Sequence, residues 1–442
     1  MTRIQLPSAG AAREDVLSRM DAMREDDANW RASRMFGLVY RAPDEIMELA
    51  REAYGRFIAE NGLSPFAFPS LRRMETEVVA MTASLLGGGD EAVGTMTSGG
   101  SESILMAVKS ARDHARAARP EITAPKMVLP ATAHPAWDKA AHYLDLGVVH
   151  VPVRDDLRAD PAAMAAACGP DAILMVASAP TYPHGVVDPI AELSEIALAR
   201  GLWLHVDACL GGFVLPFARR AGHDVPPFDF AVPGVTSISA DVHKYGFAPK
   251  GASTILYRSA DHRRHQFFAY ADWPGGVFGT PTMAGARPGG AIAAAWAVMN
   301  HLGEEGYTRI VRSTMETTRR LIDGVNAIPG LRILGRPDMT IFAIAADSLN
   351  VFALGERLKA AGWYLDSQQL PPSLHVTVSP GHAGVIEPVL RDLARCADEI
   401  RSLPPEDLSG AAAVYGMIGS LPDRGMARDL ILSYLDSLYR AG

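Results

Sequence analysis

Hydrophobic positions recur at helical spacing through the first part of the chain. They predict helices at 11–30, 43–60 and 71–86. The second of these helices has Pro43 in its first turn, and Gly62 follows its end, as is usual at helix boundaries. The chain is therefore expected to begin with a helical segment.

From about Val93 the pattern changes to short apolar runs that alternate with helical runs. The expected strands are 126–129, 148–153, 172–177, 203–207, 235–240 and 254–257. The expected helices between them are 135–144, 161–168 and 190–200. Short, continuously apolar strands separated by helices are typical of a mainly parallel sheet covered on both faces. The predicted fold class is α/β, with ligands at the carboxyl ends of the strands.

A long helix predicted at 291–328 leads into a different pattern, typical of a small α+β domain. Its expected strands are 331–334, 340–345 and 374–379, and its expected helices are 351–361, 385–402 and 426–439. A Gly- and Pro-rich stretch at 266–290 is predicted to be irregular and functional. A chain of 442 residues is too long to fold around one small hydrophobic core, so more than one domain is expected. The expected units are a helical segment, a large α/β domain and a small domain, at 1–60, 61–305 and 306–442.

The composition is that of a soluble globular protein, with 48% hydrophobic and 21% charged residues. A net charge of −8 argues against a nucleic-acid binder, because phosphate backbones are held by clustered Lys and Arg. Three widely spaced cysteines, Cys168, Cys209 and Cys396, fit a reducing compartment. No signal peptide and no apolar run of about 18 residues is found. A cytoplasmic enzyme is expected.

The residues most typical of a catalytic site lie in the loop after the strand at 235–240. The strand delivers Asp241, His243 and Lys244 into a loop broken by glycines and prolines. A lysine is almost never buried without a reason, and burial is expected to lower its pKa so that the neutral amine attacks an aldehyde. This indicates the lysine that forms a Schiff base with pyridoxal 5′-phosphate; a surface lysine on a polar loop is the alternative.

Two further features fit the same cofactor. Gly99, Gly100 and Ser101 open a predicted helix, where free N–H groups and the helix dipole favour an anion, although an ordinary serine cap is the alternative. Asp207 ends an apolar strand, and a buried carboxylate needs a cation such as a protonated pyridine nitrogen. A capping or salt-bridged aspartate is the plain alternative for Asp207. A zinc site of His205, Asp207 and Cys209 is a weaker one, because it explains neither the lysine nor the glycines.

Four longer strings resemble the sphingosine-1-phosphate lyase family, which are pyridoxal-phosphate enzymes of the aspartate aminotransferase fold type (fold type I). The strings are 97–106, 205–213, 234–251 and 285–290. The resemblance implies a homodimer with active sites at its interface, in which the segment 285–290 reaches the partner's site. No metal is implied. The membrane anchor of eukaryotic members is not seen, so a soluble, bacterial-type member is expected.

The resemblance assigns roles to the residues position by position. It implies that Lys244 forms the imine, that Asp207 pairs with the ring nitrogen, and that His243 with Gly99, Gly100 and Ser101 holds the cofactor phosphate. It further implies that His134 stacks on the ring and that Tyr182 transfers protons. A helix-capping histidine and a loop aromatic packed beside Pro183 are the alternatives for the last two residues.

The implied reaction is retro-aldol cleavage of a phosphorylated sphingoid base to a long-chain aldehyde and phosphoethanolamine. Tyr40 and Lys250 match two members of the family's substrate-phosphate cup. The chain departs from the family at Ser64, Phe66 and Ala286, where the family has His, Asp and Ser. Three other hypotheses stay open: an amino-acid decarboxylase of the same fold, a lyase for a related amino-alcohol with an altered head group, and a cofactor-binding protein without lyase activity.

Overall fold

The computed structural model describes residues 4–347, 349–402 and 424–440. Its centre is a seven-stranded sheet with the order β1-β7-β6-β5-β4-β2-β3. The strands are β1 Val93–Thr97, β2 Lys126–Pro130, β3 Gly147–Val151, β4 Ala172–Ser178, β5 Trp203–Asp207, β6 Val235–Ala240 and β7 Ser253–Tyr257. All pairs from β6 to β3 are parallel, whereas β7 is antiparallel to both of its neighbours. The predicted α/β class with a mainly parallel sheet is confirmed.

Alternate side chains of the central strands enter two hydrophobic cores on opposite faces of the sheet. Met127 and Leu129 of β2 pack in the core that contains Trp137, whereas Val128 packs in the core that contains Leu193. Every residue of β4 and β5 is buried, as expected for strands covered on both faces. The helices that follow these strands are α4 Gly100–Ala118, α5 Ala136–Leu144, α6 Pro161–Ala167, α7 Ile190–Arg200, α8 Leu215–Arg220 and α9 Ala260–Arg263.

Two of the three N-terminal helices pack against a long helix from the middle of the chain. The three are α1 Arg13–Ala22, α2 Asp44–Arg56 and α3 Pro69–Leu85, and the long helix is α10 Gly289–Asn326. Both α2 and α3 contact α10, whereas α1, predicted to be longer, has no buried residue. Gly303 interrupts α10 with a left-handed φ of 54°, close to the domain boundary predicted at 305.

The small domain contains a four-stranded antiparallel sheet with the order β10-β11-β13-β12. Its elements are β10 Leu331–Ile333, β11 Ile341–Ala346, α11 Val351–Ala360, β12 Asp366–Gln369, β13 Pro372–Thr377 and α12 Ile386–Arg401, and α14 Arg424–Leu438 ends the described chain. The N-terminal segment joins this sheet, because Met35 forms a bridge with Tyr364 and Phe36 is buried in the small domain's core. This contact carries the following residues, including Tyr40, toward the junction of the two domains.

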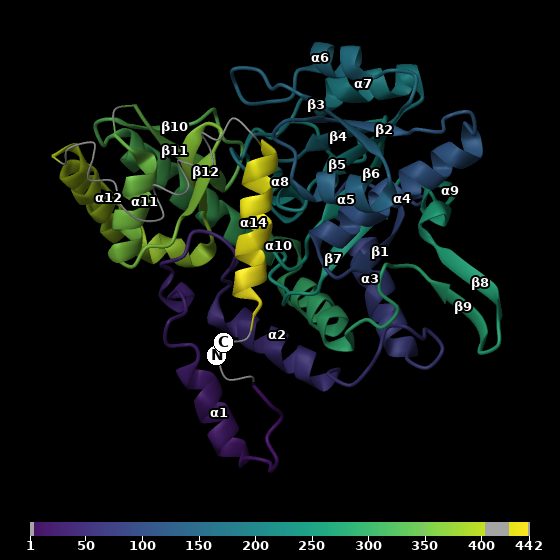
Figure 1. The fold of residues 1–442 in the computed structure, drawn as a ribbon, viewed down its shortest axis with the longest axis horizontal. Coiled ribbons are helices and arrows are strands. Elements are labelled where there is room, and N and C mark those ends of the chain that lie inside the picture. Colours follow the sequence, from purple (N-terminus) through teal and green to yellow (C-terminus); the bar gives the residue numbers. More distant parts are fainter. Residues whose placement is uncertain (1–3, 348, 403–423, 441–442) are drawn as a thin grey trace.

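The stretch at 266–290 was predicted to be irregular, and that prediction is wrong. Most of it is a two-stranded hairpin, β8 Phe268–Trp273 and β9 Gly276–Thr280, whose strands pair in antiparallel register. Its aromatic residues favour strands but have few neighbours, since Phe268, Tyr270 and Trp273 are all exposed. Figure 1 shows the hairpin projecting from the end of the molecule opposite the small domain.

Short 3-10 helices complete the described structure. They are η1 Trp30–Ala32, η2 Gly211–Phe213, η3 Arg264–Gln266 and η4 Pro380–Val385. Within the three described ranges, no helix combines the length and the apolar character needed to cross a bilayer. Residues 1–3 of the predicted helical segment, and 348, 403–423 and 441–442 of the predicted small domain, lie outside the described residues.

Candidate active site

Two adjacent parallel strands, β5 and β6, bring several of the predicted site residues together. Asp207 ends β5 and stands in register with Ser239 of β6, two residues before Asp241. The carboxyl ends of parallel strands lie at the same edge of a sheet. Lys244, which follows β6, therefore lines the same cavity as Asp207. This space, the Lys244 cavity, has a volume of about 370 Å³. Its lining includes Gly99, Gly100, Ser101, His134, Tyr182, Asp207, Cys209, Asp241, His243 and Lys244.

The amine of Lys244 is paired with a buried acid. Its Nζ lies 3.0 Å from Oδ2 of Asp241, and Asp241 is buried. Burial is the largest single effect on Lys244 and lowers its pKa, but the combined negative charge around the amine, with Asp241 the strongest contributor, raises the pKa above that of an ordinary lysine. The prediction of a lowered lysine pKa is therefore wrong, because it considered burial without the acid three residues earlier. Asp241 is the nearest acceptor for the Lys244 proton.

His243 lies beside the same acid. Its Nε2 is 3.6 Å from Oδ2 of Asp241, and burial lowers the pKa of His243 to about 4. At neutral pH the ring is therefore uncharged. The buried Nδ1 of His243 and Oδ1 of Asp241 have no hydrogen-bond partner among the described residues. Buried polar atoms left unpaired in this way mark a site that a ligand can complete.

Asp207 is held by three donors at the end of β5. Its carboxylate accepts hydrogen bonds from Trp137 Nε1 at 3.4 Å, from the Cys209 N–H at 3.2 Å and from Ser239 Oγ at 3.4 Å. The zinc alternative does not fit this arrangement. The ring nitrogens of His205 bond Ser237 and Ser239, and no group of metal-ligating side chains is found among the described residues.

The start of α4 leaves room for a ligand because its N-cap residue and its first residue, Gly99 and Gly100, have no side chains. The helix has no side-chain cap, and Ser98 instead donates from both its N–H and its hydroxyl to Glu102. A Cβ at Gly100 would lie 2.9 Å from Asp241 Oδ2, and a Cβ at Gly99 would lie 3.3 Å from His243 Cε1. The backbone here therefore approaches the cavity more closely than a larger residue permits. The ordinary serine cap is not observed.

His134 and Tyr182 meet in the Lys244 cavity. Their ring centroids are 6.1 Å apart with an interplanar angle of 86°. His134 Nδ1 also accepts a hydrogen bond from the Ala136 N–H, so the capping role and the cavity position coexist. The ring of Tyr182 stacks on His375 of β13, with centroids 4.2 Å apart and an angle of 19°. The small domain thus forms one wall of the site.

Tyr40 and Lys250 come together beside the cavity, as the sequence predicted. The Nζ of Lys250 lies 5.0 Å from the centroid of the Tyr40 ring, and Tyr40 packs against Tyr245. Burial raises the pKa of Tyr40 to about 12 despite the nearby Lys244 charge. Burial of its stem lowers the pKa of Lys250 to about 8, with help from the Lys244 charge, although the side chain reaches solvent.

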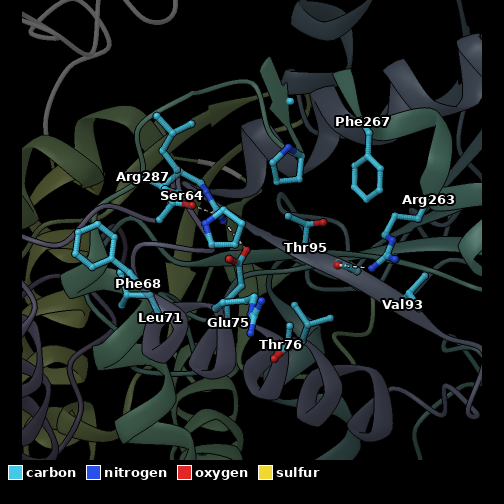
Figure 2. Close-up of a pocket in the computed structure, with 18 of the residues that line it drawn as sticks. Ser64, Phe68, Leu71, Glu75, Thr76, Val93, Thr95, Arg263, Phe267 and Arg287 are labelled. Atoms are coloured by element: carbon cyan, nitrogen blue, oxygen red, sulfur yellow. Dashed lines mark hydrogen bonds and ion pairs between the residues drawn. The ribbon is translucent and has the colours of Figure 1, made fainter. Parts of the chain in front are cut away.

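Ser64 does not join Tyr40 and Lys250. It lines a second cavity of about 430 Å³, the Ser64 cavity, together with Phe68, Glu75 and Arg287 (Figure 2). The Ser64 hydroxyl accepts a hydrogen bond from the Ala67 N–H at 3.3 Å. Within one chain the three predicted substrate-phosphate residues therefore occupy two separate places.

Arg287 ties the loop of Ser64 to the segment 285–290. Its Nη1 lies 2.5 Å from Glu75, its Nη2 donates to the Gly62 carbonyl at 2.7 Å, and its N–H donates to Asn61 Oδ1. Both stretches carry departures from the family pattern, at Phe66 and Ala286, and Phe66 is 87% exposed. The two stretches are therefore linked by hydrogen bonds through Arg287.

Sequence reasoning missed three residues near the cavity. Asp241 was named without a role, although its spacing of three residues from Lys244 is a usable signal for an ion pair. His375 and Asp366 went unnoticed, because β12 was not predicted and only the folded chain brings the small domain to Tyr182.

Comparison with known proteins places this site in a family. A model of the pyridoxal-dependent decarboxylase conserved domain matches residues 24–343. The sphingosine-1-phosphate lyase of Arabidopsis thaliana is 45% identical, over 98% of this chain and 81% of that protein. The chain belongs to the sphingosine-1-phosphate lyase family. Members of this family are pyridoxal-dependent lyases, and the cofactor expected from the sequence is confirmed.

Solved structures agree with the family assignment. A sphingosine-1-phosphate lyase from Burkholderia pseudomallei has a TM-score of 0.90 and 37% identity, covering 100% of this chain and 98% of that one. A glutamate decarboxylase from Lactobacillus brevis has a TM-score of 0.80 at 19% identity, covering 91% of this chain and 96% of that one, and shows a shared fold alone. The fold is that of fold type I pyridoxal-phosphate enzymes.

Proposed function

We propose that this lyase cleaves phosphorylated sphingoid bases, such as sphingosine-1-phosphate, to a long-chain aldehyde and phosphoethanolamine. The observation that carries the proposal is the pairing of Tyr40 with Lys250 beside the Lys244 cavity, because a phenol and an amine suit a phosphate. Identity to sphingosine-1-phosphate lyases over almost the whole chain supports the same substrate class.

The residues of the Lys244 cavity fit pyridoxal phosphate. Lys244 would hold the cofactor covalently, and Asp207 would pair with its ring nitrogen. Its phosphate would lie at the start of α4, near the unpaired Nδ1 of His243. The contacts to that phosphate would come from Gly99, Gly100, Ser101 and His243. When bound, the cofactor supplies an electron sink for the carbon–carbon bond that breaks.

The chain's own groups handle protons and orient the substrate. Asp241 accepts the proton that Lys244 must lose before its amine can react. Tyr182 takes the proton of the substrate's C3 hydroxyl, a step that general base catalysis accelerates roughly a hundredfold to ten-thousandfold. His134 would lie against the cofactor ring, and its contact with Ala136 holds its own ring in place.

We further infer that the enzyme is a homodimer with shared active sites. Ser64 lies in a different cavity from Lys244, so a site containing both residues needs a second copy of the chain. The loop of Ser64 and the segment 285–290 move as one unit through Arg287, which suits joint insertion into a partner. Exposed Phe66, and Tyr270 and Trp273 of the hairpin, supply apolar surface for such a contact.

A cytoplasmic location is part of the proposal. Cys168, Cys209 and Cys396 are all unpaired, and free thiols persist in reducing compartments.

The test is product analysis with purified protein, pyridoxal phosphate and sphingosine-1-phosphate. Long-chain aldehyde and phosphoethanolamine are expected in equal amounts, with far slower turnover of unphosphorylated sphingosine as the matched control. Carbon dioxide from an amino-acid panel, without aldehyde, would instead establish a decarboxylase. Cofactor spectra without turnover of any amino-alkanol phosphate would indicate a binding protein.

A further inference from the structure

Asp366 lies behind Tyr182 in the wall that the small domain contributes. In the antiparallel pair of β12 and β13, Asp366 stands directly opposite His375. Residues opposite each other in such a pair place their side chains on the same face of the sheet. Since the Tyr182 ring stacks on His375, Asp366 lies beside Tyr182. The Asp366 carboxylate is close enough to Tyr182 and Tyr364 to interact electrostatically with both.

The surroundings of Asp366 suit a proton acceptor. Burial raises the pKa of Asp366, and the neighbouring Tyr364 and Tyr182 side chains offset only part of this effect. From other elements, Tyr40 and His375 face the same region, and the Lys244 charge lies near Tyr182. Asp366 is thus a carboxylate in a low-polarity wall, in contact with the phenol that faces the cavity.

His375 is not suited to the same task. Burial lowers the pKa of His375 to about 4, so the ring is neutral near pH 7. Its two ring nitrogens bond Gln368 Nε2 at 3.1 Å and Thr377 Oγ1 at 2.8 Å, which fixes the ring as a flat support. Its role is to hold Tyr182 in place by stacking.

We propose that Asp366 is the proton acceptor behind Tyr182 in the cleavage reaction, an inference that rests on the proposed function. The substrate's C3 hydroxyl gives its proton to the Tyr182 oxygen while the Tyr182 proton passes to the Asp366 carboxylate. Two O–H bonds break and two form, so Tyr182 ends unchanged and Asp366 ends protonated, to release the proton afterwards to solvent. Asp366 acts through Tyr182 and not on the substrate directly, so it is a positioning residue.

The kinetic test compares Asp366→Asn with Asp366→Glu and with Asp347→Asn. Asp347 is an exposed aspartate of the same domain that pairs only with Arg332 among the described residues, and its variant should behave as wild type. Asp366→Asn should lower kcat roughly a hundredfold to a thousandfold with little change in KM. In wild type kcat should fall as pH falls through the Asp366 pKa, because the protonated acid cannot accept a proton. That acid limb should vanish in Asp366→Asn and return in Asp366→Glu.

A second readout needs neither cofactor nor turnover. With 3-fluorotyrosine placed at position 182, the ¹⁹F resonance of the wild-type apoprotein should shift as Asp366 ionises. The fluorophenol pKa should be lower in Asp366→Asn, because the carboxylate raises the pKa of Tyr182. Asp347→Asn should leave both quantities unchanged.

The outcomes separate this inference from the proposed function. A wild-type enzyme that releases no aldehyde overturns the proposed function. An active wild type with Asp366→Asn kinetics equal to those of Asp347→Asn overturns the role of Asp366 alone. If Asp366→Asn does not fold, the wild-type ¹⁹F titration decides, and a resonance that does not move between about pH 4 and 7 overturns the inference.

Discussion

The two cavities of this lyase differ in how their charges are used. In the Lys244 cavity, buried Asp207 and Asp241 face a lysine, and polar atoms of His243 and Asp241 are left without partners. In the Ser64 cavity, which is the larger, Arg287 pairs with Glu75 and with the Gly62 carbonyl, although its buried Nε and that of Arg263 have no partner among the described residues. Most of its other walls are apolar, as Phe68 and Leu71 illustrate in Figure 2.

This difference agrees with separate proposed roles, catalysis in the Lys244 cavity and contact with a second copy of the chain at the Ser64 cavity. Charges buried without full compensation are costly, and proteins retain them where a ligand or a reaction uses them. The Ser64 cavity holds an Arg287–Glu75 ion pair among mostly apolar walls, which a second copy of the chain would cover. Cavity size therefore does not distinguish the two cavities by role, whereas the kinds of residue that line them do.

The strongest test of the comparison removes the lysine. Lys244→Ala should abolish cofactor absorbance and lower lyase activity about ten-thousandfold or more, since both the covalent attachment and the amine are lost. It should also lower the melting temperature, because buried Asp241 loses its cation. The double variant Lys244→Ala with Asp241→Asn should recover stability but not activity. Cofactor bound by Lys244→Ala in borohydride-stable form would contradict the assignment.

A second test concerns the close approach at the start of α4. Gly100→Ala should weaken pyridoxal phosphate binding roughly tenfold to a hundredfold, because its Cβ would lie 2.9 Å from Asp241 Oδ2 and from Cys209 Sγ. Gly99→Ala is the matched control and should cost less than about tenfold, since its nearest neighbour, His243 Cε1, is 3.3 Å away. Absorbance titration with the cofactor measures both. The reverse order would place the phosphate elsewhere.

The third test uses pH to examine the pairing of Tyr40 with Lys250. The pKa of Lys250 is lowered to about 8, so the amine is charged below that pH and neutral above it. KM for the phosphorylated substrate should therefore rise up to about tenfold per unit above pH 8, while turnover of unphosphorylated substrate stays flat. Lys250→Met should raise KM at neutral pH and remove this dependence. An unchanged profile in Lys250→Met would exclude a phosphate role.

The smallest expected effect belongs to the Ser64 cavity. Ser64→His should improve kcat/KM for phosphorylated over unphosphorylated substrate about threefold to tenfold, because a donor returns to the phosphate cup. Thr76→Ala, in the same cavity, is the control and should change nothing. The gain should disappear in a protein diluted to monomers, since Ser64 would serve the partner's site. A gain that persists in the monomer would contradict the shared-site proposal.

Local patterns were sufficient to predict most of the fold. The strands β5 and β6 match the predicted 203–207 and 235–240 residue for residue, because both are short β-prone runs, buried at all but one position, that end at turn residues. The hairpin β8–β9 and the strand β12 were not predicted, because none of the residues of β8 or β12 is buried and their patterning is weak. Each pairs with the next strand in a hairpin, but strand preference depends on packing against neighbours, and unburied strands have little of it.

The sequence by itself determined which lysine, which acid at the end of β5 and which glycines at the start of α4 are the candidate site residues, because each stands in a short motif at a strand end or helix start. Only the tertiary structure decided the separation of Ser64 from Lys250 and the placement of Asp366 beside Tyr182. These depend on distances between segments that are remote along the chain. Electrostatic energies vary with such distances and with burial, neither of which a local pattern contains.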